Sequence, residues 1–331
     1  MKTQKEINLI PKKMEDLEYN KQRRDFLKKG AFATVGFIGL NSFGFEALAE
    51  SEKVKIVILH TNDVHSHIDP FPDNDPKFAG LGGVARRAAL INKIRSEEKN
   101  VLLLDAGDIY QGTPYFNRFG GELEFKLMSK MQYDASAIGN HDFDNGIDGL
   151  VKNLPLATFP MLCANYDVKD TELNGKIEPY KIFEKQGIKI GVFGLGIELQ
   201  GLVEKKNYLE TKYLDPMIKA AEMSVLLKNE KKCDLIICLS HLGYSYPDKQ
   251  ISDRVLAEQS KNIDIIIGAH THTFLDKPVL IRNRENKDVH VCQVGWAGIK
   301  LGKIEVVFDK HSKKKTVNGT AMGVDKKIDF A

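Results

Sequence analysis

The chain beyond residue 50 alternates short, unbroken apolar runs with longer amphipathic stretches. Unbroken apolar runs are typical of strands that are covered on both faces of a sheet. They predict strands at Lys53–Leu59, Val101–Leu104, Pro160–Ala164, Lys189–Leu195, Asp234–Leu239, Asp264–Ile267, Val289–Val294 and Lys303–Phe308.

The amphipathic stretches between these runs have the spacing of helices. In the first of them, Val84, Ala88, Ile91 and Ile94 recur on one helical face. Helices are predicted at Gly83–Glu97, Glu122–Met131, Asp215–Asn229 and Asp248–Ser260. Alternating strands and helices predict an α/β domain with largely parallel strands, and the simplest division is one domain over residues 50–331. The last strands follow one another closely, and we expect them to form an antiparallel edge.

The first 49 residues have the pattern of an export signal. A charged segment with paired arginines, Arg23 to Lys29, precedes a weakly apolar stretch that ends at Ala47-Leu48-Ala49. The arginine pair resembles a twin-arginine signal. We expect cleavage after Ala49 and a periplasmic or extracellular protein. The alternative is a retained helix that anchors the chain, but its glycines make it a poor membrane span, which needs roughly 20 apolar residues. No later segment approaches that length.

The charge and the cysteine content of the chain exclude some classes of function. The formal net charge of +3 lies entirely in the first 49 residues, because the remainder carries equal numbers of basic and acidic side chains. A folded domain without excess positive charge argues against nucleic-acid binding. The four cysteines are scattered through apolar runs, and we expect buried thiols at Cys163, Cys233, Cys238 and Cys292.

Polar residues with metal-binding side chains follow four of these apolar runs and the further short run Ala135–Ile138. Ligands of open α/β sheets bind outside the carboxyl ends of the strands. Carboxylate, imidazole and amide groups without thiolate suit Zn²⁺, Mn²⁺, Fe or Co²⁺. In Asp63-x-His65 and His270-x-His272 an extended backbone would point both side chains the same way, so each pair is expected to grip one centre. The segments are HTNDVH at 60–65, DAGDIYQG at 105–112, GNHD at 139–142, SH at 240–241 and GAHTH at 268–272.

The ordered set of these segments resembles the calcineurin-like metallophosphoesterases. ILHTNDVHSH, LDAGDIYQGTPYF and IGNHDFDNG are similar to the 5′-nucleotidase branch of that superfamily. The resemblance extends from about Lys53 to about Asp309. It implies a four-layer α/β/β/α sandwich with mixed sheets and a centre of two divalent metal ions between the sheets.

The resemblance also implies roles for individual residues. One metal would be held by Asp63, His65, Asp108 and His272. The other would be held by Asp108, Asn140, His241 and His270, with Asp108 bridging both. His141 matches the catalytic histidine of the family, Asp144 matches the carboxylate that orients it, and Asn165 matches a position that contacts substrate.

The expected function is that of an exported two-metal phosphohydrolase. It would hydrolyse nucleotides or other organic phosphate monoesters by a metal-bound hydroxide. A 2′,3′-cyclic phosphodiesterase, a UDP-sugar hydrolase and a thiosulfate-ester hydrolase share the same ligands and stay open as alternatives. A non-catalytic subunit that binds metal or nucleotide is a further alternative. Such a subunit should lack a ligand or the histidine at 141, and this chain has them all.

Family members of this type carry a second, C-terminal domain whose aromatic residues stack on the nucleobase. Only Lys310 to Ala331 follow the catalytic domain in this sequence. We therefore expect one of two situations. Either a separate protein supplies the surface that binds the base, or the domain is a less selective phosphomonoesterase.

Overall fold

The computed structural model describes residues 53–248, 250–309 and 314–328. The chain divides into two units, one of Met1–Lys53 with Asp309–Ser312 and one of Val54–Phe308 with Lys313–Ala331. The second unit holds the fold and the candidate site. The export signal predicted for residues 1–49 lies outside the described residues.

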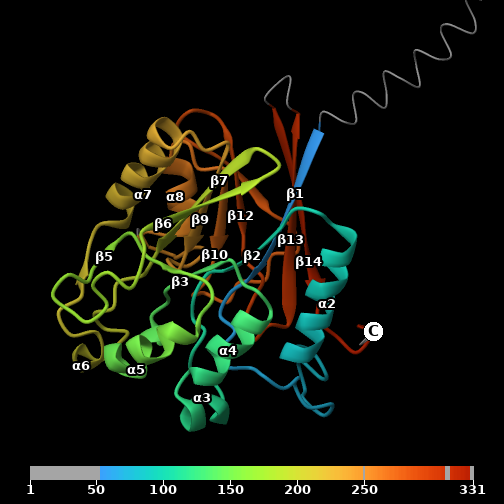
Figure 1. Cartoon of the computed structure of the whole chain (residues 1–331), viewed down its shortest axis with the longest axis vertical. Coiled ribbons are helices and arrows are strands. Elements are labelled where there is room, and N and C mark those ends of the chain that lie inside the picture. Colours follow the sequence, from blue (N-terminus) through green and yellow to red (C-terminus); the bar gives the residue numbers. More distant parts are fainter. Residues whose placement is uncertain (1–52, 249, 310–313, 329–331) are drawn as a thin grey trace, which may run out of the picture. The chain divides into compact units, whose positions relative to one another are not determined.

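Two six-stranded sheets form the centre of this unit (Figure 1). The first has the order β14-β13-β1-β2-β3-β4, and the second has the order β11-β12-β10-β9-β7-β6. The strands of the first sheet are β1 (Lys53–Thr61), β2 (Val101–Asp105), β3 (Ala135–Ala137), β4 (Met161–Leu162), β13 (Lys300–Asp309) and β14 (Lys315–Gly323). Those of the second are β6 (Tyr180–Lys185), β7 (Ile188–Leu195), β9 (Leu235–Ser240), β10 (Ile265–Gly268), β11 (Val279–Arg282) and β12 (Asp288–Cys292). A separate antiparallel pair consists of β5 (Tyr166–Asp167) and β8 (Lys212–Tyr213).

Helices connect the strands and cover the outer faces of both sheets. The α-helices are α2 (Val84–Glu97), α3 (Pro114–Phe119), α4 (Glu122–Lys130), α5 (Gly146–Asn153), α6 (Lys205–Tyr208), α7 (Pro216–Val225) and α8 (Asp253–Gln259). The short turns are η1 (His141–Phe143), η2 (Leu154–Leu156) and η3 (Leu226–Glu230). No helix in the described part of the chain is long and apolar enough to cross a bilayer.

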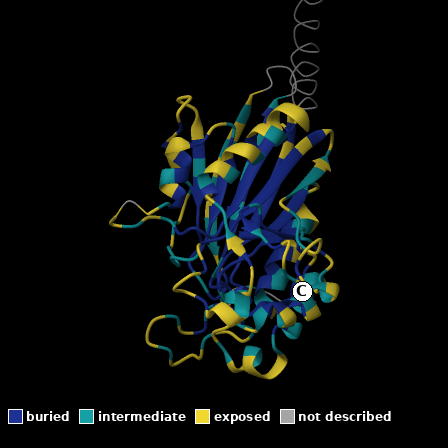
Figure 2. Cartoon of the chain, turned by 90° about the vertical axis from the view of Figure 1, so that its left-hand side faces the viewer, coloured by how far each residue is buried: buried dark blue, intermediate teal, exposed yellow. Residues whose placement is uncertain are grey.

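Successive residues of the central strands pack into different layers of the core. On β1, Ile56 and Ile58 lie between the two sheets, whereas Val57 and Leu59 pack with α2, α4 and α5. On β9, Ile237 lies between the sheets and Ile236 packs with α7 and α8. The central strands of both sheets are therefore buried on both faces, as the dark strands of Figure 2 show. The layers follow the order α/β/β/α, which confirms the predicted fold class.

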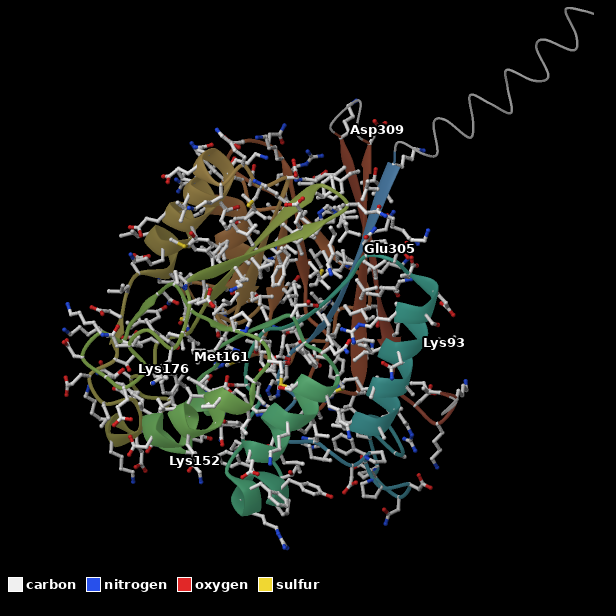
Figure 3. The ribbon with its side chains drawn as sticks, viewed as in Figure 1. Lys93, Lys152, Met161, Lys176, Glu305 and Asp309 are labelled. Carbon is white, nitrogen blue, oxygen red and sulfur yellow. The ribbon has the colours of Figure 1, made fainter. Side chains whose placement is uncertain are left out.

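Apolar side chains lie in the interior and charged side chains lie on the surface, as the sequence pattern predicts. Met161 on β4 is 1% exposed, and Figure 3 shows it inside the molecule, while Lys93 on α2 and Lys152 on α5 lie on the outside. All four cysteines are buried free thiols, which confirms that expectation.

Three expectations about the elements need correction. The helix predicted from Asp248 begins only at Asp253, because the hydroxyl of Ser252 accepts from the Val255 amide and caps the helix there. The strand predicted at Pro160–Ala164 is reduced to β4. The closing strands do not form one antiparallel edge, since β12 belongs to the second sheet and β13 to the first. Instead, β11 pairs antiparallel with β12, and β14 pairs antiparallel with β13.

The two sheets approach each other closely at Gly194 of β7. A Cβ atom on Gly194 would lie 2.0 Å from the carbonyl oxygen of Leu162 on β4. The Ala164 amide also donates to the Gly194 carbonyl across the same gap, at 2.9 Å. Only glycine lets the backbones of the two sheets meet here.

We predict that Gly194→Ala destabilises the protein by about 1–3 kcal/mol, because the added methyl group forces two backbones apart. Thermal unfolding followed by circular dichroism measures the effect. Gly323→Ala is the matched control, since the nearest atom to a Cβ at Gly323 is 3.8 Å away. Equal melting temperatures for the two variants would contradict the proposed close approach.

Candidate metal centre

The candidate site is built from loops that leave the carboxyl ends of strands in both sheets. In the first sheet, β1, β2 and β3 run parallel, and Asp63, Asp108 and Asn140 each follow one of these strands. In the second sheet, β9 and β10 run parallel, and His241 and His270 follow them. Parallel strands bring their carboxyl ends to one edge, so residues distant in sequence meet there.

Six predicted ligands form two clusters in which the ligand atoms lie within 4.8 Å of one another. One cluster consists of Asp63, His65 and His272, and the other of Asp108, His241 and His270. Asn140 joins the second cluster, because its Oδ1 lies 2.9 Å from Nδ1 of His270. All seven residues predicted as ligands therefore converge.

Asp108 lies between the two clusters. Its Oδ2 atom is 3.1 Å from Nε2 of His241 in its own cluster and 3.7 Å from Nε2 of His65 in the other. Asp63 also reaches across, with Oδ1 4.0 Å from Nε2 of His241. The geometry fits a carboxylate shared by two adjacent cations, as in two-metal hydrolytic sites.

Hydrogen bonds fix the tautomers of two histidines. Nδ1 of His65 lies 3.0 Å from the Tyr110 carbonyl, and Nδ1 of His241 lies 2.8 Å from the Ala106 carbonyl. Because a carbonyl can only accept, each Nδ1 carries a proton, and Nε2 is the ring nitrogen left to face the cluster. Nε2 of His241 is buried and has no hydrogen-bond partner among the described residues. When this nitrogen is deprotonated, its lone pair and the carboxylate oxygen of Asp108 at 3.1 Å can hold a cation between them.

Burial and neighbouring charges shift the pKa values of the clustered residues. Burial raises the pKa of Asp63, and the nearby charge of Asp108 adds to this effect. Burial also opposes the ionisation of Asp108, but the positive charge of His241 and the nearby histidines outweigh it and lower the pKa of Asp108. Burial opposes the charge on His241 as well, but the carboxylates of Asp108 and Asp63 outweigh it and raise the pKa of His241 to about 10, so a cation that binds here replaces the proton on this ring. Burial lowers the pKa values of His270 and His272 to about 4, so both imidazoles are neutral near pH 7. Neutral imidazoles and buried carboxylates are the forms that bind divalent cations.

Five of the ligands have a left-handed backbone, which corrects the expectation of extended pairs. The φ angles are 49° at Asp63, 51° at His65, 58° at Asp108, 71° at His270 and 49° at His272. In this conformation the two residues of each pair need not point alike. His270 and His272 accordingly belong to different clusters, so the prediction that they grip one centre is wrong. Left-handed non-glycine residues are costly and gather at functional sites.

Two residues that carried no predicted role hold these loops. The buried carboxylate of Asp142 accepts from the Gly139 amide at 2.8 Å and from the Ile109 amide at 2.9 Å, and so joins the loops of Asn140 and Asp108. Asn62 donates to Asp63 and accepts from the Val294 amide. The sequence signal was available, since both residues lie inside the recognised motifs.

His141 and Asp144 form a pair at the margin of the centre. Nδ1 of His141 lies 2.8 Å from Oδ2 of Asp144, and this hydrogen bond raises the pKa of His141. The His141 amide donates to Oδ1 of Asp108 at 2.8 Å, which ties the pair to the metal cluster. The imidazole is half-buried, so its Nε2 can reach a bound molecule.

Asn165 lies elsewhere in the core. Its side chain is fully buried, accepts from the Gly196 amide and donates to the Gly196 carbonyl, both at 2.8 Å. The structure gives its amide group a structural role between two loops. It does not bring Asn165 to an accessible surface, and contact with substrate stays a prediction.

Comparisons with known proteins agree with this geometry. The calcineurin-like phosphoesterase family profile matches residues 56–274. The chain is 35% identical over 296 residues to a snake venom 5′-nucleotidase of Crotalus adamanteus, covering 83% of this chain and 49% of that protein. It is 30% identical over 295 residues to a 5′-nucleotidase of Homo sapiens, covering 83% and 50%.

Among solved structures, a 5′-nucleotidase precursor from Thermus thermophilus superposes with a TM-score of 0.75 and 32% identity, covering 83% of this chain and 55% of that one. The chain thus spans about half the length of the curated relatives it matches. From the profile match and these similarities, the chain belongs to the calcineurin-like phosphoesterase family and is homologous to the 5′-nucleotidases.

Proposed function

We propose that this protein hydrolyses phosphate monoesters, with 5′-nucleotides as its main substrates. The observation that carries the proposal is the convergence of all seven ligands around Asp108, next to the His141–Asp144 pair. A non-catalytic binding subunit would not need the pair. The relatives named 5′-nucleotidases support the choice of substrate class.

The residues of the chain fit two divalent cations. Asp63, His65 and His272 would hold one, and His241, His270 and Asn140 would hold the other, with Asp108 between them. When bound, two such cations activate water and neutralise charge on the phosphoryl oxygens.

His141 supplies the acid chemistry in this proposal. Its Nδ1 is engaged with Asp144, so the proton available for transfer is on Nε2. The hydrogen bond with Asp144 raises the pKa of His141, which favours the protonated ring. A protonated Nε2 can donate to the oxygen of the leaving alcohol as the bond to phosphorus breaks. Asp144 fixes the ring so that Nε2 faces the substrate.

We also propose that the protein acts outside the cytoplasm. The support is the sequence pattern of residues 1–49, with Arg23 and Arg24 before a weakly apolar stretch.

Asp108→Asn should abolish both phosphate release from AMP and the binding of two metal ions per chain. The amide removes the negative charge that both clusters share. Phosphate assays and metal analysis of the purified protein measure the two effects. Asp148→Asn, a change of an exposed carboxylate on α5, should leave both unaltered. Full activity in the Asp108 variant would refute a two-metal mechanism.

His141→Ala should lower kcat by about 10²–10⁴-fold, because the proton donor is lost while the ligands stay in place. The metal content should equal that of the unaltered protein. Asp144→Asn should give a smaller loss of kcat, since the imidazole remains but its orientation weakens. A His141 variant that loses its metal, or keeps its kcat, would contradict this role.

Replacing Arg23 and Arg24 together by lysine should keep the protein in the cytoplasm of a bacterium that has a twin-arginine pathway. Activity in osmotic-shock fluid and in the cytoplasm measures the distribution. Lys2→Arg with Lys5→Arg, outside the paired arginines, is the control. Unchanged export of the paired variant would refute this signal.

A further inference from the structure

A pocket of about 570 Å³ opens beside the metal centre, and one of its walls is the metal-cluster residue His270. This volume lies within the range of about 300–1,000 Å³ that is typical of small-ligand sites. A substrate whose phosphate lies on the metal cluster can extend past His270 into this pocket, because His270 belongs to both. The pocket is therefore placed to receive the group that leaves with the oxygen.

We propose that this pocket, lined by His270, Glu198, Gln200, Leu202, Tyr213 and Tyr246 among others, binds the nucleoside moiety of the substrate. The catalytic domain then recognises nucleotides without a second domain or a partner. The inference rests on the proposed phosphatase function but concerns a binding site that can be measured without turnover.

Two tyrosines give the pocket flat apolar walls. Tyr246 is held in place because its hydroxyl donates to the Leu242 carbonyl at 2.8 Å. Tyr213 ends the short strand β8, which pairs with β5 at Tyr166, and the two rings are 6.4 Å apart. Side chains fixed in this way lose little freedom on binding. Any nucleobase can stack on an aromatic side chain, because every base has a flat π-face. A base therefore fits against these two tyrosine rings.

The polar side chains of the pocket can hydrogen-bond the sugar of a nucleotide and repel its phosphate. Glu198 and Gln200 are exposed at its wall, and among the described residues the Glu198 carboxylate has no ion pair or hydrogen bond. A carboxylate accepts hydrogen bonds from the vicinal hydroxyls of a ribose, as acidic residues do in dinucleotide-binding domains. Its negative charge also repels a phosphate group. The neutral nucleoside is thus favoured in the pocket and the phosphate at the metals.

A second pocket, of about 580 Å³, has different properties. Its lining includes Phe71, Pro72, Pro114, Tyr115 and Arg118, and it contains no residue of either metal cluster. An arginine would attract the phosphate away from the metals. This pocket is the natural control, because Tyr115 offers an aromatic ring of the same kind.

The test compares AMP with ribose 5-phosphate, which has the sugar and the phosphate but no base. Tyr213→Leu should lower kcat/KM for AMP by about tenfold through the lost stacking and leave ribose 5-phosphate unaffected. Tyr213→Phe keeps the ring and should behave as the unaltered protein. Tyr115→Leu should have no effect on either substrate. Equal losses for both substrates in Tyr213→Leu, or a loss selective for AMP in Tyr115→Leu, would overturn the proposal.

Adenosine, which has no phosphate, separates this inference from the phosphatase function. Calorimetry should detect adenosine binding to the unaltered, Zn²⁺-loaded protein and about tenfold weaker binding to Tyr213→Leu. If no phosphate ester is hydrolysed but adenosine binds in this way, the proposed function fails and the pocket stands. If phosphate esters are hydrolysed but adenosine does not bind, the pocket proposal fails alone.

A second variant covers the case in which Tyr213→Leu does not fold. Glu198→Gln changes an exposed side chain, so folding should be unaffected. It should weaken the binding of adenosine and leave the weaker binding of 2′,3′-dideoxyadenosine unaltered, because only adenosine has the hydroxyls that Glu198 would accept from. Equal effects on both ligands would contradict this placement of the ribose.

Discussion

The structure depends on two carboxylates, Asp63 and Asp108, which are buried together with imidazoles where the two sheets meet. Burial disfavours a charged carboxylate, and a second carboxylate nearby adds repulsion. The two carboxylates respond in opposite ways: the pKa of Asp63 is raised, which favours its neutral form, and the pKa of Asp108 is lowered, which favours its charged form. Burying these polar and charged side chains does not by itself stabilise the folded state. Divalent cations remove the conflict, and this explains why so many acceptors are directed to one place.

Holding these groups requires a scaffold that tolerates strain. The left-handed backbone at Asp63, Asp108 and His270 is costly at each position, and it persists because neighbouring bonds determine it. Asp142 ties the loop of Asp108 to the loop of Asn140 through backbone amides. Behind these loops the strands are buried on both faces, so the sheets provide the rigid base from which strained loops can extend. The packed layers of helices and strands stabilise the fold, and the candidate metal ligands lie on loops at the edge of these layers.

The sequence predicted the α/β layers and the residues that converge at the candidate metal centre, but not the geometry that joins them. Unbroken apolar runs such as that of β9 are enough to identify strands covered on both faces. The loops are different, because local spacing carries no information about left-handed backbone. His270-x-His272 was assigned to one centre by spacing, whereas the resemblance to the family divided it correctly between two. Asn165 lies in a recognisable segment, yet its amide is used within the core. Short strands such as β8 depend on tertiary pairing, which a linear pattern does not reveal.

Specificity has a different origin from the metal chemistry. The ligands follow the carboxyl ends of strands in the two sheets, and they indicate a reaction class and little about the substrate. The pocket beside His270 is built instead from Glu198, Gln200 and Leu202, which follow β7, and from Tyr213 at the end of β8. These segments carry no periodic pattern and lie outside both six-stranded sheets. A change of substrate can therefore arise in these loops while the seven ligands stay as they are, because the two sets of residues share only the wall at His270.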